Sequence, residues 1–176
     1  LQREARITTV FVTHDQEEAL SMSDRIGVMN NGRIEQLGTP KEIYATPATA
    51  YVADFVGAAN RVNVSLEGND VPGHQRVRLG DATVAARCDP MLQGSKGTLI
   101  LRPEDLDLSL ARSNAGASSG TVRQRQYLGS KTSYKIALSD GNVIGVELHG
   151  DNHDRFSLGQ DVFVSVPADR AVVLGQ

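Results

Sequence analysis

The sequence predicts a short mixed α/β segment over residues 1–60, followed by a mainly β domain over residues 61–176. Two observations support this division. Before residue 60, one β-branched run alternates with helical spacings, whereas after residue 60 short β-branched segments are separated by Gly, Asp and Asn. A chain of 176 residues with 40% hydrophobic residues has room for one ordinary domain or two small ones.

The composition narrows the class of protein. Eighteen Lys and Arg stand against 21 Asp and Glu, a net charge of −3, so no overall positive field would attract nucleic acid or anionic lipid. The single cysteine, Cys88, has no internal disulfide partner. We find neither a signal peptide nor an apolar run long enough to cross a bilayer, which favours a reducing cytoplasm.

The first elements are expected to be a strand and a helix. The run TTVFVTH, residues 8–14, is typical of a buried strand. Asp15 followed by Glu18 has capping-box spacing and predicts a helix start. Apolar residues recur at helical spacing on its expected inward face: Ala19, Met22 and Ile26.

A hairpin and two short helices are expected next. Strands 25–30 and 33–38 flank Asn31-Gly32, a pair that supplies the positive φ angles of a primed turn. Thr39-Pro40 opens a helix over residues 41–46, and the apolar spacing that begins at Tyr51 predicts a second helix that ends at Gly57.

The second part reads as a small barrel or sandwich whose topology the sequence leaves open. Eight strands are expected, over residues 62–68, 75–80, 82–87, 97–102, 120–129, 132–139, 142–149 and 161–167. The stretch SNAGASSG, residues 113–120, has no large side chain and is expected to be a flexible surface loop. Asp140-Gly141 predicts a hairpin turn.

His14 is the strongest candidate for chemistry. A histidine at the carboxyl end of a strand in an α/β unit lies where such sheets bind their ligands. Its imidazole can donate a hydrogen bond to a phosphate or hold an attacking water. The alternative is a histidine that only bonds a neighbouring loop.

A family resemblance strengthens the functional interpretation of His14. The run VFVTHDQEEALSMSDRIGVMNNGRIEQLGTPKEIYATPATAYVADFVG, residues 10–57, resembles the segment after the Walker B motif in ATP-binding subunits of ABC importers, in the branch of the maltose, polyamine, sulfate and ferric-iron systems. In that family the matching histidine is the switch histidine, which contacts the γ-phosphate of ATP in a closed dimer. The resemblance implies that His14 is both the catalytic and the ATP-binding residue here.

The second part carries a resemblance of its own. LRPEDLDLS at 101–109, GTV at 120–122, YLGS at 127–130 and GQDVFVSVPADRAVVL at 159–174 are similar to the C-terminal regulatory module of the same importers. That module is an OB-like β-barrel called a TOBE domain. The combined expectation is a mixed α/β remnant of an ABC nucleotide-binding domain, followed by an OB-like barrel.

The sequence departs from the family where ATP chemistry is performed. It contains no Gly-Lys step for a phosphate loop, no Gly-Gly for a signature loop and no strand that ends in Asp-Glu. We therefore expect a C-terminal part of a subunit that uses ATP and Mg²⁺ when complete. This chain alone is expected neither to hydrolyse ATP nor to bind it tightly, and no metal site is assigned to it.

The resemblance also implies partners and a location. It implies a homodimer through the ATPase and regulatory domains, membrane-embedded permease subunits, an indirect link to a substrate-binding protein, and a place on the inner face of the cell membrane. A polyamine is the first expectation for the substrate, ahead of ferric iron and organophosphonate. The alternative is a stand-alone TOBE module that binds a small oxyanion or a regulator. Nucleic-acid binding is disfavoured by the negative net charge.

Three other motifs are assigned structural roles. HGDNHD, residues 149–154, gathers possible metal ligands but is better interpreted as a solvated turn. Arg123 and Arg125 are interpreted as solvated charges on a strand face, since the chain is only 5% aromatic. Arg102 to Asp105 is interpreted as a turn held by an Arg–carboxylate pair, with a contact across a dimer as the functional alternative.

Overall fold

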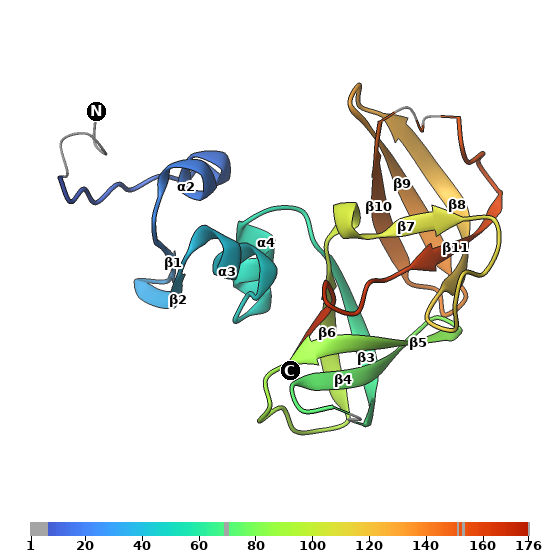
Figure 1. The fold of residues 1–176 in the computed structure, drawn as a ribbon, viewed down its shortest axis with the longest axis horizontal. Helices are drawn as coiled ribbons and strands as arrows, with labels where there is room; N and C mark the ends of the chain where they lie inside the picture. The colour runs from blue at the N-terminus through green and yellow to red at the C-terminus, as the bar shows by residue number, and fades with distance from the viewer. Residues whose placement is uncertain (1–6, 69–70, 151, 153, 176) are drawn as a thin grey trace.

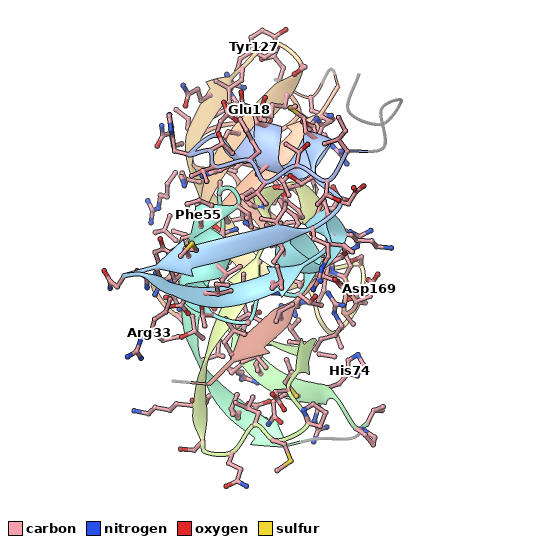
Figure 2. The ribbon with its side chains drawn as sticks, turned by 90° about the vertical axis from the view of Figure 1, so that its left-hand side faces the viewer. Glu18, Arg33, Phe55, His74, Tyr127 and Asp169 are labelled. Atoms are coloured by element: carbon pink, nitrogen blue, oxygen red, sulfur yellow. The ribbon has the colours of Figure 1, made fainter. Side chains whose placement is uncertain are left out.

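The computed structural model describes residues 7–68, 71–150, 152 and 154–175. An N-terminal segment of short helices and one hairpin lies beside a mainly β part (Figure 1). Figure 2 looks onto the N-terminal segment, with the hairpin across the middle of the molecule, Tyr127 at one end and His74 toward the other. Within the described residues, no helix is long and apolar enough to span a membrane.

From Ile7 onward, where the structure describes it, the N-terminal segment contains three helices and one two-stranded sheet. They are α2 (Gln16–Met22), β1 (Ile26–Asn30), β2 (Arg33–Gly38), α3 (Pro40–Ala45) and α4 (Ala50–Phe55). All three helices start at a polar cap, because the side chains of Asp15, Thr39 and Thr49 accept hydrogen bonds from main-chain N–H groups of the first turn. The hairpin turn has φ angles of 47° at Asn31 and 78° at Gly32, as the sequence predicts.

The described residues of the mainly β part form ten strands in two sheets rather than one barrel. They are β3 (Asn60–Gly68), β4 (His74–Leu79), β5 (Ala82–Cys88), β6 (Lys96–Leu101), β7 (Asp107–Ser109), β8 (Ser118–Tyr127), β9 (Lys131–Leu138), β10 (Val143–His149), β11 (Asp161–Ser165) and β12 (Val172–Leu174). Five form a closed barrel in the order β12-β5-β4-β3-β6, and five form a sheet in the order β10-β9-β8-β11-β7. Strand β12 closes the barrel by pairing in parallel with β5 and antiparallel with β6.

The barrel and the five-stranded sheet share one hydrophobic core. Buried residues of both, from Val62 on β3 to Val164 on β11, form a single cluster. Tyr134 and Phe156 are buried members of this cluster and pack edge to face, with ring centroids 5.8 Å apart. The Tyr134 hydroxyl donates to the Asn152 carbonyl at 2.6 Å, so its polar end is satisfied. The two sheets therefore form one folding unit.

The predicted strand over residues 8–14 is wrong. These residues have no regular secondary structure, and the side chains of Val10 and Val12 are 90% and 91% exposed. A buried strand needs neighbours on both edges, and no strand among the described residues pairs with this run. The expected inward face of α2 is also wrong in part, because Met22 is exposed and Ile26 is buried on β1.

The predicted loop over residues 113–120 is wrong for its second half. Ala117 and Ser118 are fully buried, and Ser118 begins β8. Small residues are needed here because a neighbouring turn packs close by: the Ser118 hydroxyl donates to Asp81 Oδ1 at 3.3 Å and the Ser119 N–H donates to it at 2.7 Å. Gly120 lies against β9, where an added Cβ would come within 2.6 Å of Ile136 Cγ2.

Replacing Gly120 tests how closely β8 and β9 pack. In Gly120→Ala, the new methyl would also lie 2.9 Å from the main-chain oxygen of Ala137, which a rotamer change does not relieve. We expect a loss of about 1–3 kcal/mol in the free energy of unfolding, measured by urea denaturation. Gly27→Ala is the control, because its Cβ would meet only Leu37 Cδ1, at 3.7 Å. Equal effects of the two substitutions would contradict the packing account.

We expect the contact that Asp81 makes between the barrel and the five-stranded sheet to weaken in acid. The Ser119 N–H lowers the pKa of Asp81 to about 2, burial opposes this, and Arg112 adds to the lowering. Because the folded pKa lies below the unfolded value of about 3.9, the contribution is present above pH 4 and is lost as the pH falls toward 2. Asp81→Asn should therefore cost up to about 1 kcal/mol at pH 7, since the site is partly exposed, and less at pH 2. If Asp81→Asn and wild type differed by the same free energy of unfolding at both pH values, this expectation would be contradicted.

Candidate functional site

His14 lies at a bend between the extended N-terminal run and α2, with an exposed side chain. Hydrogen bonds on both sides of it fix this bend. The Asp15 N–H donates to Thr13 Oγ1 at 2.9 Å, and Thr13 Oγ1 donates to Glu18 Oε2 at 2.7 Å. Asp15 Oδ1 accepts from the N–H groups of Glu17 and Glu18 at 2.9 and 3.1 Å.

This network differs in one detail from the predicted capping box. Asp15 caps α2 as expected, but the Glu18 carboxylate bonds the Thr13 hydroxyl rather than the main chain of Asp15. The result is a short rigid link from Thr13 to the first turn of the helix. The side chain of His14 is exposed, and the described residues make no hydrogen bond to it.

A second polar cluster joins the N-terminal segment to the barrel. Arg102, directly after β6, is only 4% exposed, and its Nη1 donates to the carbonyls of Ala53, Gly57 and Ala58 at 2.9, 3.1 and 3.2 Å. Its Nη2 donates to the Tyr44 carbonyl at 3.3 Å, and its Cζ lies 4.3 Å from the centroid of the Tyr44 ring. Burial lowers the pKa of Arg102, while Asp105 and Asp54 oppose this effect.

The Arg102 contacts correct the expected Arg–carboxylate turn. The guanidinium bonds main-chain carbonyls at the C-terminal ends of α3 and α4, which helices leave without internal partners. Arg87 on β5 adds a bond of the same type, from Nη2 to the Ala45 carbonyl at 2.7 Å. This role of Arg102 could not be predicted from the sequence, because nothing near Arg102 indicates carbonyl partners more than forty residues away.

The bonds of Arg102 and Arg87 to main-chain carbonyls form the joint between the N-terminal segment and the barrel. Two further contacts lie near this joint. The Tyr44 hydroxyl donates to the Glu104 carboxylate, and burial raises the pKa of Glu104. The Asn60 side chain exchanges two hydrogen bonds with the main chain of Gly145, at 2.6 and 2.8 Å. Since Gly145 lies on the edge strand β10, the Asn60 amide satisfies part of an otherwise open edge.

Arg123 and Arg125 keep the structural interpretation predicted from the sequence, and the HGDNHD motif is described only in part. Arg123 is exposed, and Arg125 pairs with Asp154 at 3.4 Å, which fits charges on a strand face. Of the HGDNHD motif, Asp151 and His153 lie outside the described residues, so the prediction of a solvated turn stays a prediction. No group of three or more metal-binding side chains occurs in the part of the chain that the structure describes.

Comparisons with known proteins now supply a family. Residues 99–174 match the model of the TOBE domain. The chain is 41% identical over 175 residues to the spermidine/putrescine import ATP-binding protein PotA 1 of Pseudomonas aeruginosa, covering 99% of this chain and 47% of that protein. It is 40% identical over 179 residues to the spermidine/putrescine import ATP-binding protein PotA of Ruegeria pomeroyi, with coverage of 99% and 47%. Over almost its whole length the chain is thus similar to spermidine/putrescine import ATP-binding proteins.

These similarities confirm the resemblance to importer ATP-binding subunits with a TOBE domain, but they cover only part of those proteins. The chain spans about half the length of the import ATP-binding proteins that it matches. Its fold is similar to that of the cytoplasmic molybdate-binding protein ModG, with a TM-score of 0.57, 14% identity, and coverage of 66% of this chain and 96% of ModG. At that identity the likeness shows the fold alone. The mainly β, OB-like part is confirmed, while the assignment of the N-terminal segment to an ATPase domain stays a prediction.

We expect a substitution of Arg102 to loosen the N-terminal segment and to leave the five-stranded sheet unchanged. Arg102→Lys keeps the charge but removes the planar fork, so main-chain carbonyls of both helices lose their donor. Leaving buried carbonyls unbonded costs about 1–3 kcal/mol each. We expect faster hydrogen exchange over residues 26–56 and unchanged protection in β8 and β9. Arg123→Lys, on an exposed position, is the control; unchanged exchange in Arg102→Lys would contradict the assignment.

Proposed function

We propose that this chain is the C-terminal part of the ATP-binding subunit of an ABC importer for polyamines, spermidine or putrescine. In this proposal residues 1–60 are the last part of the ATPase domain and residues 61–176 are the regulatory domain. The similarity to import ATP-binding proteins over 99% of the chain carries the proposal, because it extends beyond the TOBE match at 99–174 to the segment that contains His14.

The geometry at His14 is compatible with a role as the switch histidine. The capped start of α2 holds the bend, and the exposed imidazole projects from it without a competing bond in the described structure. A neutral imidazole in that place donates one hydrogen bond to a terminal phosphate oxygen or orients the attacking water.

This sequence supplies only some of the residues that would hold ATP and Mg²⁺. Bound ATP supplies the γ-phosphate whose hydrolysis drives import. Of the groups that hold it, this sequence offers His14 but no Gly-Lys phosphate loop and no Asp-Glu pair for Mg²⁺. The remaining contacts must come from polypeptide outside this sequence. We therefore propose that the chain by itself binds ATP weakly and that hydrolysis belongs to the complete subunit.

The proposed partners follow from the same assignment. A pair of complete subunits would close on ATP and act on membrane-embedded permease subunits, and an external binding protein would deliver the polyamine to the permease. The subunit would then sit on the inner face of the cell membrane. The alternative, a stand-alone TOBE module for a small oxyanion or a regulator, predicts a start codon immediately before Leu1. The proposal predicts an upstream reading frame with a Gly-Lys loop.

The decisive experiment uses the complete subunit, reconstituted in liposomes with the permease and binding protein encoded beside it. Spermidine should stimulate ATP hydrolysis. His14→Ala should lower that hydrolysis about 100-fold or more while nucleotide binding is retained. His149→Ala, which removes an exposed histidine at the end of β10, is the matched control and should leave hydrolysis unchanged.

Each result has a separate meaning. Undiminished turnover in His14→Ala would overturn the role of His14 but leave the importer assignment standing. Hydrolysis that responds to ferric iron or an organophosphonate and not to spermidine would overturn the polyamine assignment. Failure of the complete subunit to associate with any permease would overturn the proposed function as a whole.

A further inference from the structure

Thr13, the residue before His14, bonds the main chain on the other side of the histidine. Its Oγ1 accepts from the Asp15 N–H at 2.9 Å, which closes a ring around the main chain of His14. Threonine hydroxyls form turns of this kind with main-chain groups close by in the sequence, and such a ring restricts the φ and ψ angles of the residue inside it. Thr13 therefore restricts the direction in which the His14 side chain leaves the main chain.

The Thr13 hydroxyl is itself held by α2. Thr13 is half-buried, and its Oγ1 donates to Glu18 Oε2 at 2.7 Å. Threonine is branched at Cβ, so few χ1 rotamers are open to it, and two bonds to the hydroxyl select one of them. Glu18 lies in the first turn of α2 (Figure 2), and its N–H donates to Asp15 Oδ1 at 3.1 Å. Side chains before and after His14 thus tie its main chain to the helix.

The Thr13 hydroxyl has no hydrogen left for a second acceptor. A threonine hydroxyl carries one O–H donor, and Glu18 accepts it. While this network is intact, Thr13 therefore has no donor to offer a phosphate oxygen. The imidazole of His14 has one, and the described residues make no hydrogen bond to it. An effect of Thr13 on phosphate chemistry must then act through His14.

We propose that Thr13, anchored by Glu18, is a positioning residue for His14 in ATP hydrolysis. This inference rests on the proposed function, in which His14 meets the terminal phosphate. An imidazole whose main chain is already tied loses less conformational entropy when it reaches the phosphate, because only its own side-chain torsions remain to be fixed. Since a misplacement of about 1 Å can lower a rate about 100-fold, loss of the Thr13 bonds should lower kcat.

The primary test measures ATP hydrolysis by the complete subunit in the reconstituted importer. Thr13→Val keeps the branched shape of the side chain and removes the hydroxyl. We expect kcat to fall about tenfold or more while the KM for ATP changes little, because Thr13 does not touch the nucleotide. Thr13→Ser keeps the hydroxyl and should restore most of the activity. Unchanged kcat in Thr13→Val, or equal losses in Thr13→Val and Thr13→Ser, would overturn the proposal.

A double-mutant cycle separates positioning from direct action on the nucleotide. If Thr13 acts only through His14, Thr13→Val should lower kcat by less than about twofold in a subunit that already carries His14→Ala. Radiolabelled ATP resolves such low rates. A further tenfold loss in the double variant would overturn the proposal. Full hydrolysis in His14→Ala would overturn the role of His14 and this inference with it, whereas a loss in His14→Ala with none in Thr13→Val overturns this inference alone.

Thr49→Val is the matched control for folding. Thr49 caps another helix, α4, by accepting from the Val52 N–H at 3.2 Å, so the same substitution removes a capping hydroxyl there. It should lower the midpoint of thermal unfolding and leave kcat unchanged. Equal losses of kcat in Thr49→Val and Thr13→Val would show that Thr13 acts through stability alone, and would overturn the proposal.

Two variants of Glu18 test the anchor. Glu18→Gln keeps an oxygen that can accept from the Thr13 hydroxyl, whereas Glu18→Ala removes it. We expect kcat to be several-fold higher in Glu18→Gln than in Glu18→Ala, at a similar KM for ATP. Equal kcat values in the two variants would overturn the part assigned to Glu18.

Discussion

The buried guanidinium of Arg102 holds the two parts of this protein together. The N-terminal segment is small, and its own core consists of five buried residues: Ile26, Val28, Ile43, Val52 and Val56. A core of that size does not stabilise an independent fold, so the segment depends on docking to the barrel. Docking buries the ends of two helices, whose carbonyls need donors when water is excluded. Arg102 supplies these donors from one side chain, and Arg87 supplies another.

The apolar part of the joint is too small to replace those bonds. It consists of Ala53 on α4 packed against Ile100 and Val172 of the barrel, with Ala59 and Leu174 partly buried beside them. Burial of one such branched side chain contributes about 1.5–3 kcal/mol, whereas several buried carbonyls left without donors would cost as much or more. Docking of the segment therefore depends on hydrogen bonds to its buried main-chain carbonyls.

The mainly β part is organised differently, around a single core shared by the barrel and the sheet. Contact between the two sheets is fixed at their rims by polar side chains that meet main chain. Asp81 on the turn between β4 and β5 holds the start of β8, and Asn60 on β3 holds the edge strand β10. The N-terminal segment, which carries His14, meets the barrel at the Arg102 cluster.

Much of the fold follows from sequence alone, and the physical reason is that those features are local. The Asn31-Gly32 hairpin, the caps at Asp15 and Thr39, and eight β segments depend on residues close together in the chain. The candidate His14 and the importer family were likewise recognisable from contiguous motifs. Tertiary structure alone decided the short strands β7 and β12, the burial of Ala117 and Ser118, and the exposure of the run before His14. It also decided the partners of Arg102, because a guanidinium that bonds carbonyls more than forty residues away has no local pattern, and only packing determines which buried oxygens lack a donor.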